Sequence, residues 1–189
     1  AYLEDEHGKK YLDALTGIAV VGLGHAHPKV ASALADQAKT LTHTSNLYQI
    51  PLQTKLAAKL CGISGMDSAF FANSGAEANE AAIKLIRKYG SKINNNKESI
   101  ILAAESSFHG RTFAALSATG QPKYHQGFEP LLSGFKFFKY NDFESVKNIF
   151  KECEKSNQTI SGILLPFFSA CSNDLNIESP HGPAPIIAT

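Results

Sequence analysis

Apolar and polar residues near the start of the chain are arranged in a way that predicts a small hairpin. Tyr2-Leu3 and Tyr11-Leu12 flank a polar stretch. That stretch contains Gly8, and a glycine is common where two short strands reverse direction. We therefore expect residues 2–12 to form two short paired strands.

Two amphipathic helices are predicted next, each opened by a proline, which suits the first turn of a helix. Pro28 opens the first, and apolar side chains recur every four residues behind it, at Val30, Leu34 and Ala38. Pro51 opens the second, and Gly62 is expected to end it. The buried stripe expected on this second helix consists of Leu52, Leu56 and Leu60.

From residue 68 onward, short apolar runs alternate with segments of helical spacing. The runs predict strands at residues 69–72, 99–103, 135–138 and 159–165. Helical spacing predicts a helix from the turn at 73–75 to Gly90, a short helix over 112–117, and a helix capped by Asp142 that carries Phe143, Val146 and Phe150. Strands that alternate with helices are typical of an α/β fold with a mostly parallel sheet.

Composition places the chain among core-forming proteins. Of its 189 residues, 43% are hydrophobic and 19% are charged, which excludes disorder as the main state. The 18 basic and 17 acidic residues give a net charge of +1, so no nucleic-acid partner is expected. The apolar runs are far shorter than the ~20 residues needed to cross a bilayer, so no membrane partner is expected either.

The N-terminal residues and the cysteines favour a reducing compartment. Glu4-Asp5-Glu6 is acidic where a secretory signal would be basic and then apolar, and no Arg-rich transit peptide is present. Cys61, Cys153 and Cys171 are widely separated, which supports neither a disulfide framework nor a zinc site. We therefore expect a cytoplasmic protein without a bound metal.

In an open α/β sheet, ligands bind beyond the carboxyl ends of the strands, which directs attention to the loops at 73–76 and 105–111. In the first loop, the N–H groups of Gly75 and Ala76 would face an anion such as phosphate at a helix start. The same residues also suit ordinary helix capping, so both interpretations stay open. No Gly-Lys-Ser/Thr follows Gly75, and His27 stands where a dinucleotide fingerprint needs its third glycine, so neither ATP nor NAD is expected.

The second loop carries three candidate side chains. Arg111 lies at the predicted start of a short helix, where the helix dipole disfavours a cation, so a carboxylate ligand is its natural partner. Phe108 could present its ring to a flat heteroaromatic ligand. On these residues alone, a solvated arginine and a core phenylalanine are the simpler explanation. His109 could be a base or a hydrogen-bonding loop residue, and nothing in the sequence favours the base.

Four stretches of the sequence together resemble the class III aminotransferases, which depend on pyridoxal 5'-phosphate (PLP). They are Gly8-Lys9-Lys10-Tyr11-Leu12-Asp13, Leu23-Gly24-His25-Ala26-His27-Pro28, Asn73-Ser74-Gly75-Ala76-Glu77-Ala78-Asn79-Glu80-Ala81 and Ser107-Phe108-His109-Gly110-Arg111-Thr112. The last two, with Gly127-Phe128-Glu129-Pro130-Leu131, resemble the branch of the class that acts on N-acetylornithine. The likeness runs from Tyr2 to about Leu165.

The resemblance implies a fold, a cofactor and roles for four residues. The fold would be α/β, PLP-dependent transferase fold type I, with an N-terminal segment at 1–50, a partial large domain at 51–165 and a tail at 166–189 outside the family pattern. Gly75 and Ala76 would bind the phosphate of PLP, Phe108 would stack on its pyridine ring, and Arg111 would hold the α-carboxylate of N-acetylornithine. The implied reaction transfers the δ-amino group to 2-oxoglutarate in arginine biosynthesis, in a homodimer with shared sites.

The family's Schiff-base lysine, and the aspartate that pairs with the pyridine nitrogen, lie in the half of the fold after the matched region. We therefore expect no catalytic lysine in this chain, and an isolated chain that is inactive. Lys84, on the helix after the turn at 73–75, is expected to be a solvated surface residue. The tail after Leu165 suggests unrelated or frame-shifted coding.

Two alternatives remain open. The first is a related transaminase that acts on ornithine, succinylornithine or 4-aminobutyrate, although Arg111 and residues 127–131 count against the last of these. The second is a non-catalytic binding protein that kept the phosphate-binding turn. In either case, a sheet that stops after its fourth predicted strand leaves an unpaired edge and an uncovered apolar face, which predicts poor solubility.

Overall fold

The computed structural model describes residues 2–93 and 97–165. The chain divides into two compact units, Ala1–Lys55 and Leu56–Thr189. The domain boundaries expected from the sequence, 1–50 and 51–165, remain predictions. The interpretation of the tail at 166–189 and the thiol of Cys171 lie outside the described residues.

The first unit begins with the predicted hairpin. Strands β1 (Tyr2–Glu4) and β2 (Lys10–Leu12) pair antiparallel, with Tyr2 opposite Leu12. The Asp5 carboxylate organises the turn between them, because its Oδ1 atom accepts hydrogen bonds at 3.0 Å from the N–H groups of His7 and Lys9. A single turn, α1 (Thr16–Ala19), follows the hairpin.

Helices α2 (Pro28–Thr40) and α3 (Pro51–Ser64) begin at the two predicted prolines. The predicted end of α3 at Gly62 is wrong. The helix continues for two residues, and Gly65, in the left-handed region with φ +72°, ends it by donating a 3.0 Å hydrogen bond to the Cys61 carbonyl. The predicted buried stripe is also wrong, because Leu52 is 58% and Leu56 is 48% exposed.

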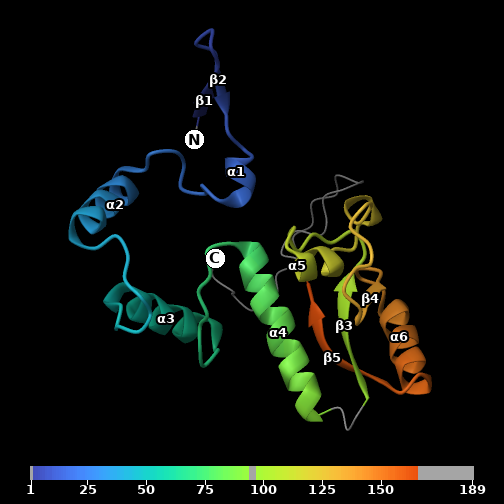
Figure 1. Cartoon of the computed structure of the whole chain (residues 1–189). Helices are drawn as coiled ribbons and strands as arrows, with labels where there is room; N and C mark the ends of the chain where they lie inside the picture. Colours follow the sequence, from blue (N-terminus) through green and yellow to red (C-terminus); the bar gives the residue numbers. More distant parts are fainter. Residues whose placement is uncertain (1, 94–96, 166–189) are drawn as a thin grey trace. The chain divides into compact units, whose positions relative to one another are not determined.

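The second unit is an α/β layer structure built on a parallel sheet (Figure 1), as predicted. Strands β3 (Glu98–Ala104), β4 (Phe135–Phe138) and β5 (Gln158–Leu164) lie in the order β4-β3-β5. Around them are α4 (Gly75–Ile93), α5 (Phe113–Ala118), the short 3-10 helix η1 (Pro122–Tyr124) and α6 (Phe143–Lys155). Asp142 caps α6 as predicted, since its Oδ1 atom accepts a 3.0 Å bond from the Ser145 N–H.

Alternate residues of β3 point to opposite faces of the sheet, and each face has its own core. One core joins the even positions to α6 and contains Ile100, Leu102, Ala104, Phe138, Ile149 and Cys153. The other joins Ile101 to α4 and the end of α5, and contains Ile83, Ile101, Ala118 and Leu164. β3 is therefore covered on both faces, which explains its continuous apolar sequence.

The pairing of β3 with β5 is interrupted by one extra residue in β5. Ile100 lies opposite Ile160, but Ile101 lies opposite Gly162. The extra residue reverses which face the later side chains of β5 occupy. Ile160 therefore packs on the α6 side, whereas Leu164, four residues later, packs on the α4 side.

The predicted strand at 69–72 is wrong. These residues lead into α4, but no described segment pairs with them, and Phe70 is 61% exposed. A strand needs a hydrogen-bonded neighbour, which an apolar run by itself cannot guarantee.

The predicted end of α4 at Gly90 is wrong as well, because the helix continues to Ile93. Gly90 is buried inside the helix, and a β-carbon there would collide with the hydroxyl groups of Ser99 and Ser161. This glycine lets α4 approach β3 and β5 closely and does not end the helix.

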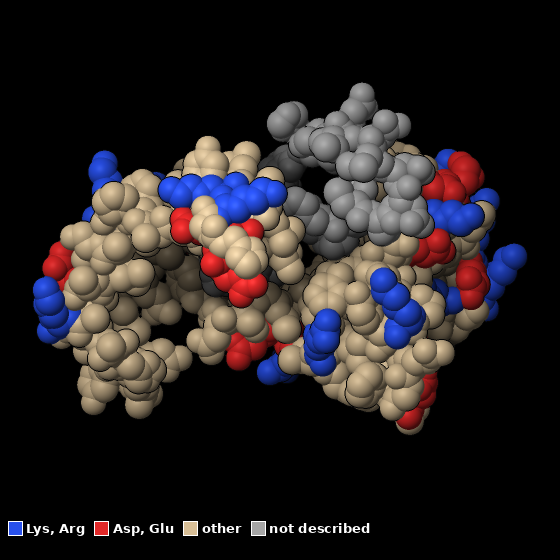
Figure 2. Space-filling view, turned by 90° about the horizontal axis from the view of Figure 1, so that it is seen from above, with Lys and Arg blue, Asp and Glu red and all other residues tan. Residues whose placement is uncertain are grey.

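Two further features concern membrane-spanning helices and the distribution of surface charge. No described helix has the length and apolar character needed to cross a bilayer. On the face that Figure 2 shows, basic and acidic side chains are interspersed.

Candidate functional site

The turn before α4 leaves two backbone donors unused. The Ser74 hydroxyl accepts a 3.2 Å bond from the Glu77 N–H, and the Glu77 carboxylate accepts a 2.6 Å bond from the Asn73 N–H. Within the described part of the chain, no acceptor meets the N–H groups of Gly75 and Ala76. The positive end of the helix dipole lies at the same place, so this turn can accept an anion such as phosphate.

The loop at 105–111 packs directly against this turn. Gly110, with φ +133°, has no room for a side chain, because a β-carbon there would lie 2.8 Å from the Ala76 β-carbon. On α4, the Asn79 amide donates a 2.7 Å hydrogen bond to the His109 carbonyl. The structure therefore brings together the two loops that the sequence analysis selected.

Residues 119–121 hold the other side of the 105–111 loop. The Thr119 hydroxyl accepts a 3.0 Å bond from the His109 N–H, and the Ser107 hydroxyl accepts a 3.1 Å bond from the Gly120 N–H. The Gln121 side chain donates a 3.1 Å bond to the Ser107 carbonyl. With its backbone bonded on both sides, the loop has a fixed position relative to α4.

Phe108 and Arg111 both lie beside Tyr124 of η1. The Phe108 and Tyr124 rings meet edge to face, with centroids 5.7 Å apart. The Arg111 guanidinium carbon is 5.9 Å from the centre of the Tyr124 ring, and the Lys123 ammonium is 5.0 Å from it. Phe108 is 45% exposed, so its ring is not a core residue and remains accessible to a ligand.

Free backbone N–H groups at the start of α5, directly after Arg111, are hydrogen-bonded by an acidic side chain from α4. The Glu80 Oε1 atom accepts bonds from the N–H groups of Ala114 at 3.0 Å and Ala115 at 3.2 Å. Glu80 therefore takes the place of a local cap, since Thr112 makes no side-chain cap bond. Its negative charge also offsets the helix dipole that disfavours a cation at Arg111.

His109 is 97% buried within the site, as only 3% of its surface is exposed. Burial lowers the pKa of its imidazole to about 4, so the ring is neutral at pH 7. Its Nε2 atom has no hydrogen-bond partner among the described residues. The sequence could not decide between a base and a loop residue, and the geometry places this histidine in the packed interior of the loop.

The glycine-rich segment at 22–28 lies in the first unit and is held by Asp13. The His25 Nε2 atom is 2.7 Å from the Asp13 Oδ2 atom, and Asp13 Oδ1 accepts a 2.8 Å bond from the Thr16 N–H. The Thr16 N–H, followed by His25, lowers the pKa of the Asp13 carboxyl. Two of the four family stretches are therefore joined by one side-chain hydrogen bond.

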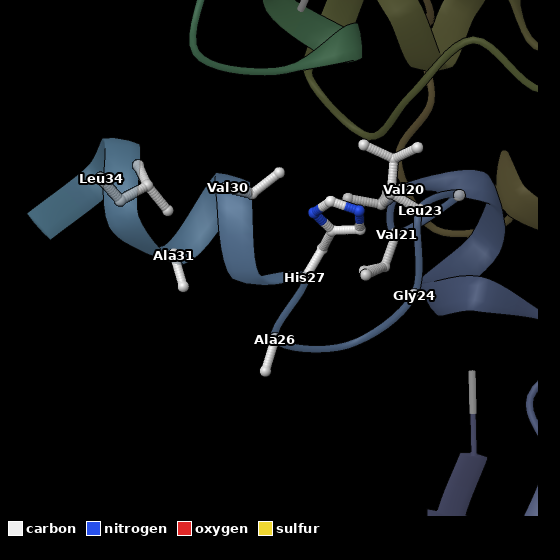
Figure 3. Close-up of a pocket in the computed structure, with 10 residues that line it drawn as sticks. Val20, Val21, Leu23, Gly24, Ala26, His27, Val30, Ala31 and Leu34 are labelled. Carbon is white, nitrogen blue, oxygen red and sulfur yellow. The ribbon is translucent and has the colours of Figure 1, made fainter.

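The same segment lines a pocket of about 450 Å³ (Figure 3). Its walls are mostly apolar and consist of Val20, Val21, Gly22, Leu23, Gly24, Ala26, His27, Val30, Ala31 and Leu34. The imidazole of His27 supplies the polar side chain of this lining. Such a lining suits an apolar group better than a phosphate.

Three residues near the two loops were missed by the sequence analysis: Glu80, Lys123 and Tyr124. Glu80 reaches α5 across more than 30 positions of the sequence, which no local pattern reveals. Pro122 signals the start of η1 and could have marked the next two residues, but not their nearness to Phe108 and Arg111. Lys84 is exposed on α4, as predicted.

Other site types find no support in the described residues. They contain no group of His, Cys, Asp or Glu side chains that could hold a metal ion. Cys61 and Cys153 are free thiols, and burial raises the pKa of the Cys153 thiol.

Sequence comparison assigns the family. A model of the aminotransferase class-III family matches residues 1–166. The chain therefore belongs to the class III aminotransferases, and the family predicted from the four stretches is confirmed.

Curated relatives cover most of this chain but are much longer. The chain is 59% identical over 164 residues to the acetylornithine aminotransferase of Prochlorococcus marinus subsp. pastoris, across 87% of this chain and 40% of the relative. It is 54% identical over 143 residues to the acetylornithine aminotransferase of Methanocaldococcus jannaschii, across 76% of this chain and 36% of the relative. The chain thus spans at most about 40% of the length of these relatives.

Solved structures give the same fold. The ornithine aminotransferase of Toxoplasma gondii, described with partial occupancy of PLP at its active site, is similar with a TM-score of 0.79 and 26% identity. That match covers 87% of this chain and 38% of the other. An (S)-enantioselective omega-transaminase of Thermomicrobium roseum is similar with a TM-score of 0.75 and 30% identity, across 86% and 40% of the two chains. The predicted fold class is confirmed.

Proposed function

We propose that this chain is part of a PLP-dependent aminotransferase that converts N-acetylornithine in arginine biosynthesis. The δ-carbon of the donor would lose its amino group and become an aldehyde. The keto carbon of 2-oxoglutarate would gain the amino group, so that 2-oxoglutarate becomes glutamate. The cytoplasmic location, the homodimer and the inactivity of the isolated chain are parts of the same proposal.

One observation carries the proposal: the close contact between Gly110 and Ala76. It places the loop that bears Phe108 and Arg111 against the helix start that can accept a phosphate. A ligand with a phosphate, a flat ring and a neighbouring carboxylate would find a suitable group for each part.

The residues present fit PLP. The N–H groups of Gly75 and Ala76, which have no acceptor among the described residues, would bind the phosphate. Phe108, with nearly half of its surface exposed, would cover one face of the pyridine ring. When bound, PLP supplies an electron sink for the carbanion formed as a proton leaves the substrate carbon.

Arg111 would orient the amino donor. Its guanidinium can hold a carboxylate through two parallel hydrogen bonds, which fixes the direction of the substrate more strictly than a lysine would. Glu80 stabilises the helix that follows Arg111 and thereby helps to hold it in place. A donor without a carboxylate would lose this orientation.

The choice of donor follows sequence similarity. Curated relatives that are 50–59% identical carry the name acetylornithine aminotransferase, whereas the neighbour named ornithine aminotransferase is 26% identical. We therefore prefer N-acetylornithine to ornithine as the donor.

Two experiments test the proposal. A complete version of the protein is assayed with N-acetylornithine, ornithine, succinylornithine and 4-aminobutyrate in separate reactions with 2-oxoglutarate. We expect the highest kcat/KM for N-acetylornithine, and a preference for free ornithine would overturn the donor assignment.

The second experiment tests the phosphate site on the present chain. Gly75→Pro removes one anion-facing N–H at a position where proline is well tolerated, the first of a helix. We expect it to weaken binding of inorganic phosphate and of PLP. Phe143→Pro makes the same change at the start of α6 and is expected to leave both affinities unchanged. Equal binding by both variants would contradict the assignment.

A further inference from the structure

We propose that Glu77 is a positioning residue of the turn before α4. The inference rests on the proposed function, because it concerns the turn that would bind the phosphate of the cofactor. The Glu77 carboxylate holds the Asn73 N–H and thereby fixes the direction of the free N–H groups that follow. Its negative charge at the same time limits how tightly the turn binds an anion.

The first argument is the reach of the Glu77 side chain. Its Oε2 atom accepts a 2.6 Å hydrogen bond from the Asn73 N–H, and the Ser74 hydroxyl accepts a 3.2 Å bond from the Glu77 N–H. In an ordinary capping box the glutamate binds the N–H of the N-cap residue, which here is Ser74. Glu77 reaches one residue further back, so its side chain spans the whole turn.

The second argument is the place of the free donors inside this turn. Gly75 and Ala76, whose N–H groups have no acceptor among the described residues, lie between Asn73 and Glu77. The bond from Asn73 to Glu77 therefore closes a loop of backbone around both donors. Without that bond the backbone before Gly75 would be free to rotate, and a glycine restricts such rotation least.

The third argument is the charge of Glu77. The side chain is exposed, and no basic group in the described part of the chain lies within ion-pair distance of it. A carboxylate in the first turn of a helix offsets the positive end of the helix dipole, which is the feature that attracts phosphate. The acceptor and the charge of Glu77 therefore have opposite effects on the affinity for an anion.

The test uses two matched pairs, and NMR follows inorganic phosphate binding to the present chain through the Gly75 and Ala76 N–H signals. Wild type and Glu77→Asp carry the same charge, but the shorter aspartate is not expected to reach Asn73. Glu77→Gln and Glu77→Ala are both neutral, but only glutamine keeps an acceptor. Within each pair, we expect the variant without the bond to bind phosphate about three- to tenfold more weakly, the range of a lost helix cap.

The charge is measured by comparing wild type with Glu77→Gln. We expect the glutamine variant to bind phosphate about two- to fivefold more tightly, the range of an exposed charge pair, and high salt to reduce this gain. The Asn73 N–H signal should move in Glu77→Asp and Glu77→Ala and stay close to wild type in Glu77→Gln. Glu144→Ala removes an acid from the first turn of α6 and is the control, expected to bind phosphate as wild type does.

Equal phosphate affinities within both pairs would overturn the inference, as would an equal loss in Glu144→Ala. These outcomes can be told apart from a failure of the proposed function. Phosphate binding that is lost in Gly75→Pro but unchanged in all the Glu77 variants would reject the role of Glu77 and leave the proposed function standing. A wild-type chain that binds no phosphate would reject the cofactor site and the role of Glu77 together.

Discussion

A β-carbon at Gly110 would lie 2.8 Å from the β-carbon of Ala76. The two residues are far apart in the sequence, yet this contact sets how closely the candidate substrate loop approaches the candidate phosphate turn. Gly110 is also in the left-handed half of backbone space, with φ +133°.

We expect Gly110→Ala to lower the free energy of unfolding by about 1–3 kcal/mol, the usual cost of backbone strain and overpacking. It should also weaken PLP binding, because the loop must move away from Ala76. Urea unfolding and a PLP titration measure the two effects. Gly62→Ala on α3 is the control, since a β-carbon there meets nothing within 4 Å. Equal unfolding free energies for the two variants would contradict the steric argument.

Glu80→Ala should destabilise the chain by about 0.5–2 kcal/mol, the usual cost of losing a helix cap. The reason is that the N–H groups of Ala114 and Ala115 would lose their shared acceptor. Glu154→Ala on the exposed surface of α6 is expected to change stability by less than about 0.5 kcal/mol. Hydrogen exchange at Ala114 and Ala115 should accelerate in the first variant alone.

Acidification should destabilise the chain through His109. The unfolded imidazole takes up a proton near pH 6.5, but the folded one does so only near pH 4. Between these values the unfolded state binds more protons, so the free energy of unfolding falls as the pH falls, by up to about 1.4 kcal/mol per pH unit. The contribution of the neutral ring is complete above pH 6.5 and is lost toward pH 4.

Urea unfolding at several pH values between 7 and 4 tests this dependence. His109→Asn should have a shallower slope than wild type over that range, whereas the exposed His43→Asn should match wild type. The lowered pKa values of Asp5 and Asp13 act at lower pH, below their ordinary value of 3.8. Parallel curves for wild type and His109→Asn would show that another group causes the loss.

Asp13→Asn should loosen the backbone at Leu15 and Thr16 in the first unit. The variant loses the charge that binds His25, and it weakens the acceptor of the Thr16 N–H. We expect faster hydrogen exchange at Leu15 and Thr16, with the hairpin at Tyr2 unaffected. Acid should have the same effect on wild type, because the lowered pKa means that stability from this carboxylate is present above about pH 3.8 and is lost below it. Equal exchange rates in wild type and variant would show that the contacts of the Asp13 carboxylate do not hold this segment in place.

The isolated chain should self-associate. Along the described chain β4 and β5 each pair on one side, which leaves two open sheet edges, and Leu85 and Tyr89 on α4 are 70% and 55% exposed. Light scattering should detect oligomers that become smaller in a Leu85→Lys, Tyr89→Lys double variant. A monodisperse wild-type monomer would refute this expectation.

The sequence predicted the elements that depend on local signals. Pro28, Pro51 and Asp142 correctly predicted three helix starts, and three of the four apolar runs correctly predicted the three strands of the described parallel sheet. The rule that ligands bind beyond the strand ends selected two loops that do meet in the structure.

Features that depend on distant packing were not predictable from the sequence. In the sequence, Gly90 cannot be told from a glycine that ends a helix, and only the nearby serines of β3 and β5 show that it serves close packing. The run at 69–72 is as apolar as a true strand but has no paired neighbour among the described residues. Tyr124 meets Arg111 through the fold, so neither residue signals the other in the sequence.

The extra residue in β5 makes this strand sensitive to its own length. Ile160 and Leu164 are an even number of positions apart and would share one face of a regular strand, yet they fill opposite cores. Without the extra residue, Ile160 and Leu164 would be an odd number of positions apart, and each could keep its face in a regular strand. A second inserted residue at this point would instead turn the end of the strand over and exchange its inward and outward side chains, so an insertion here should harm the chain more than a deletion of the extra residue.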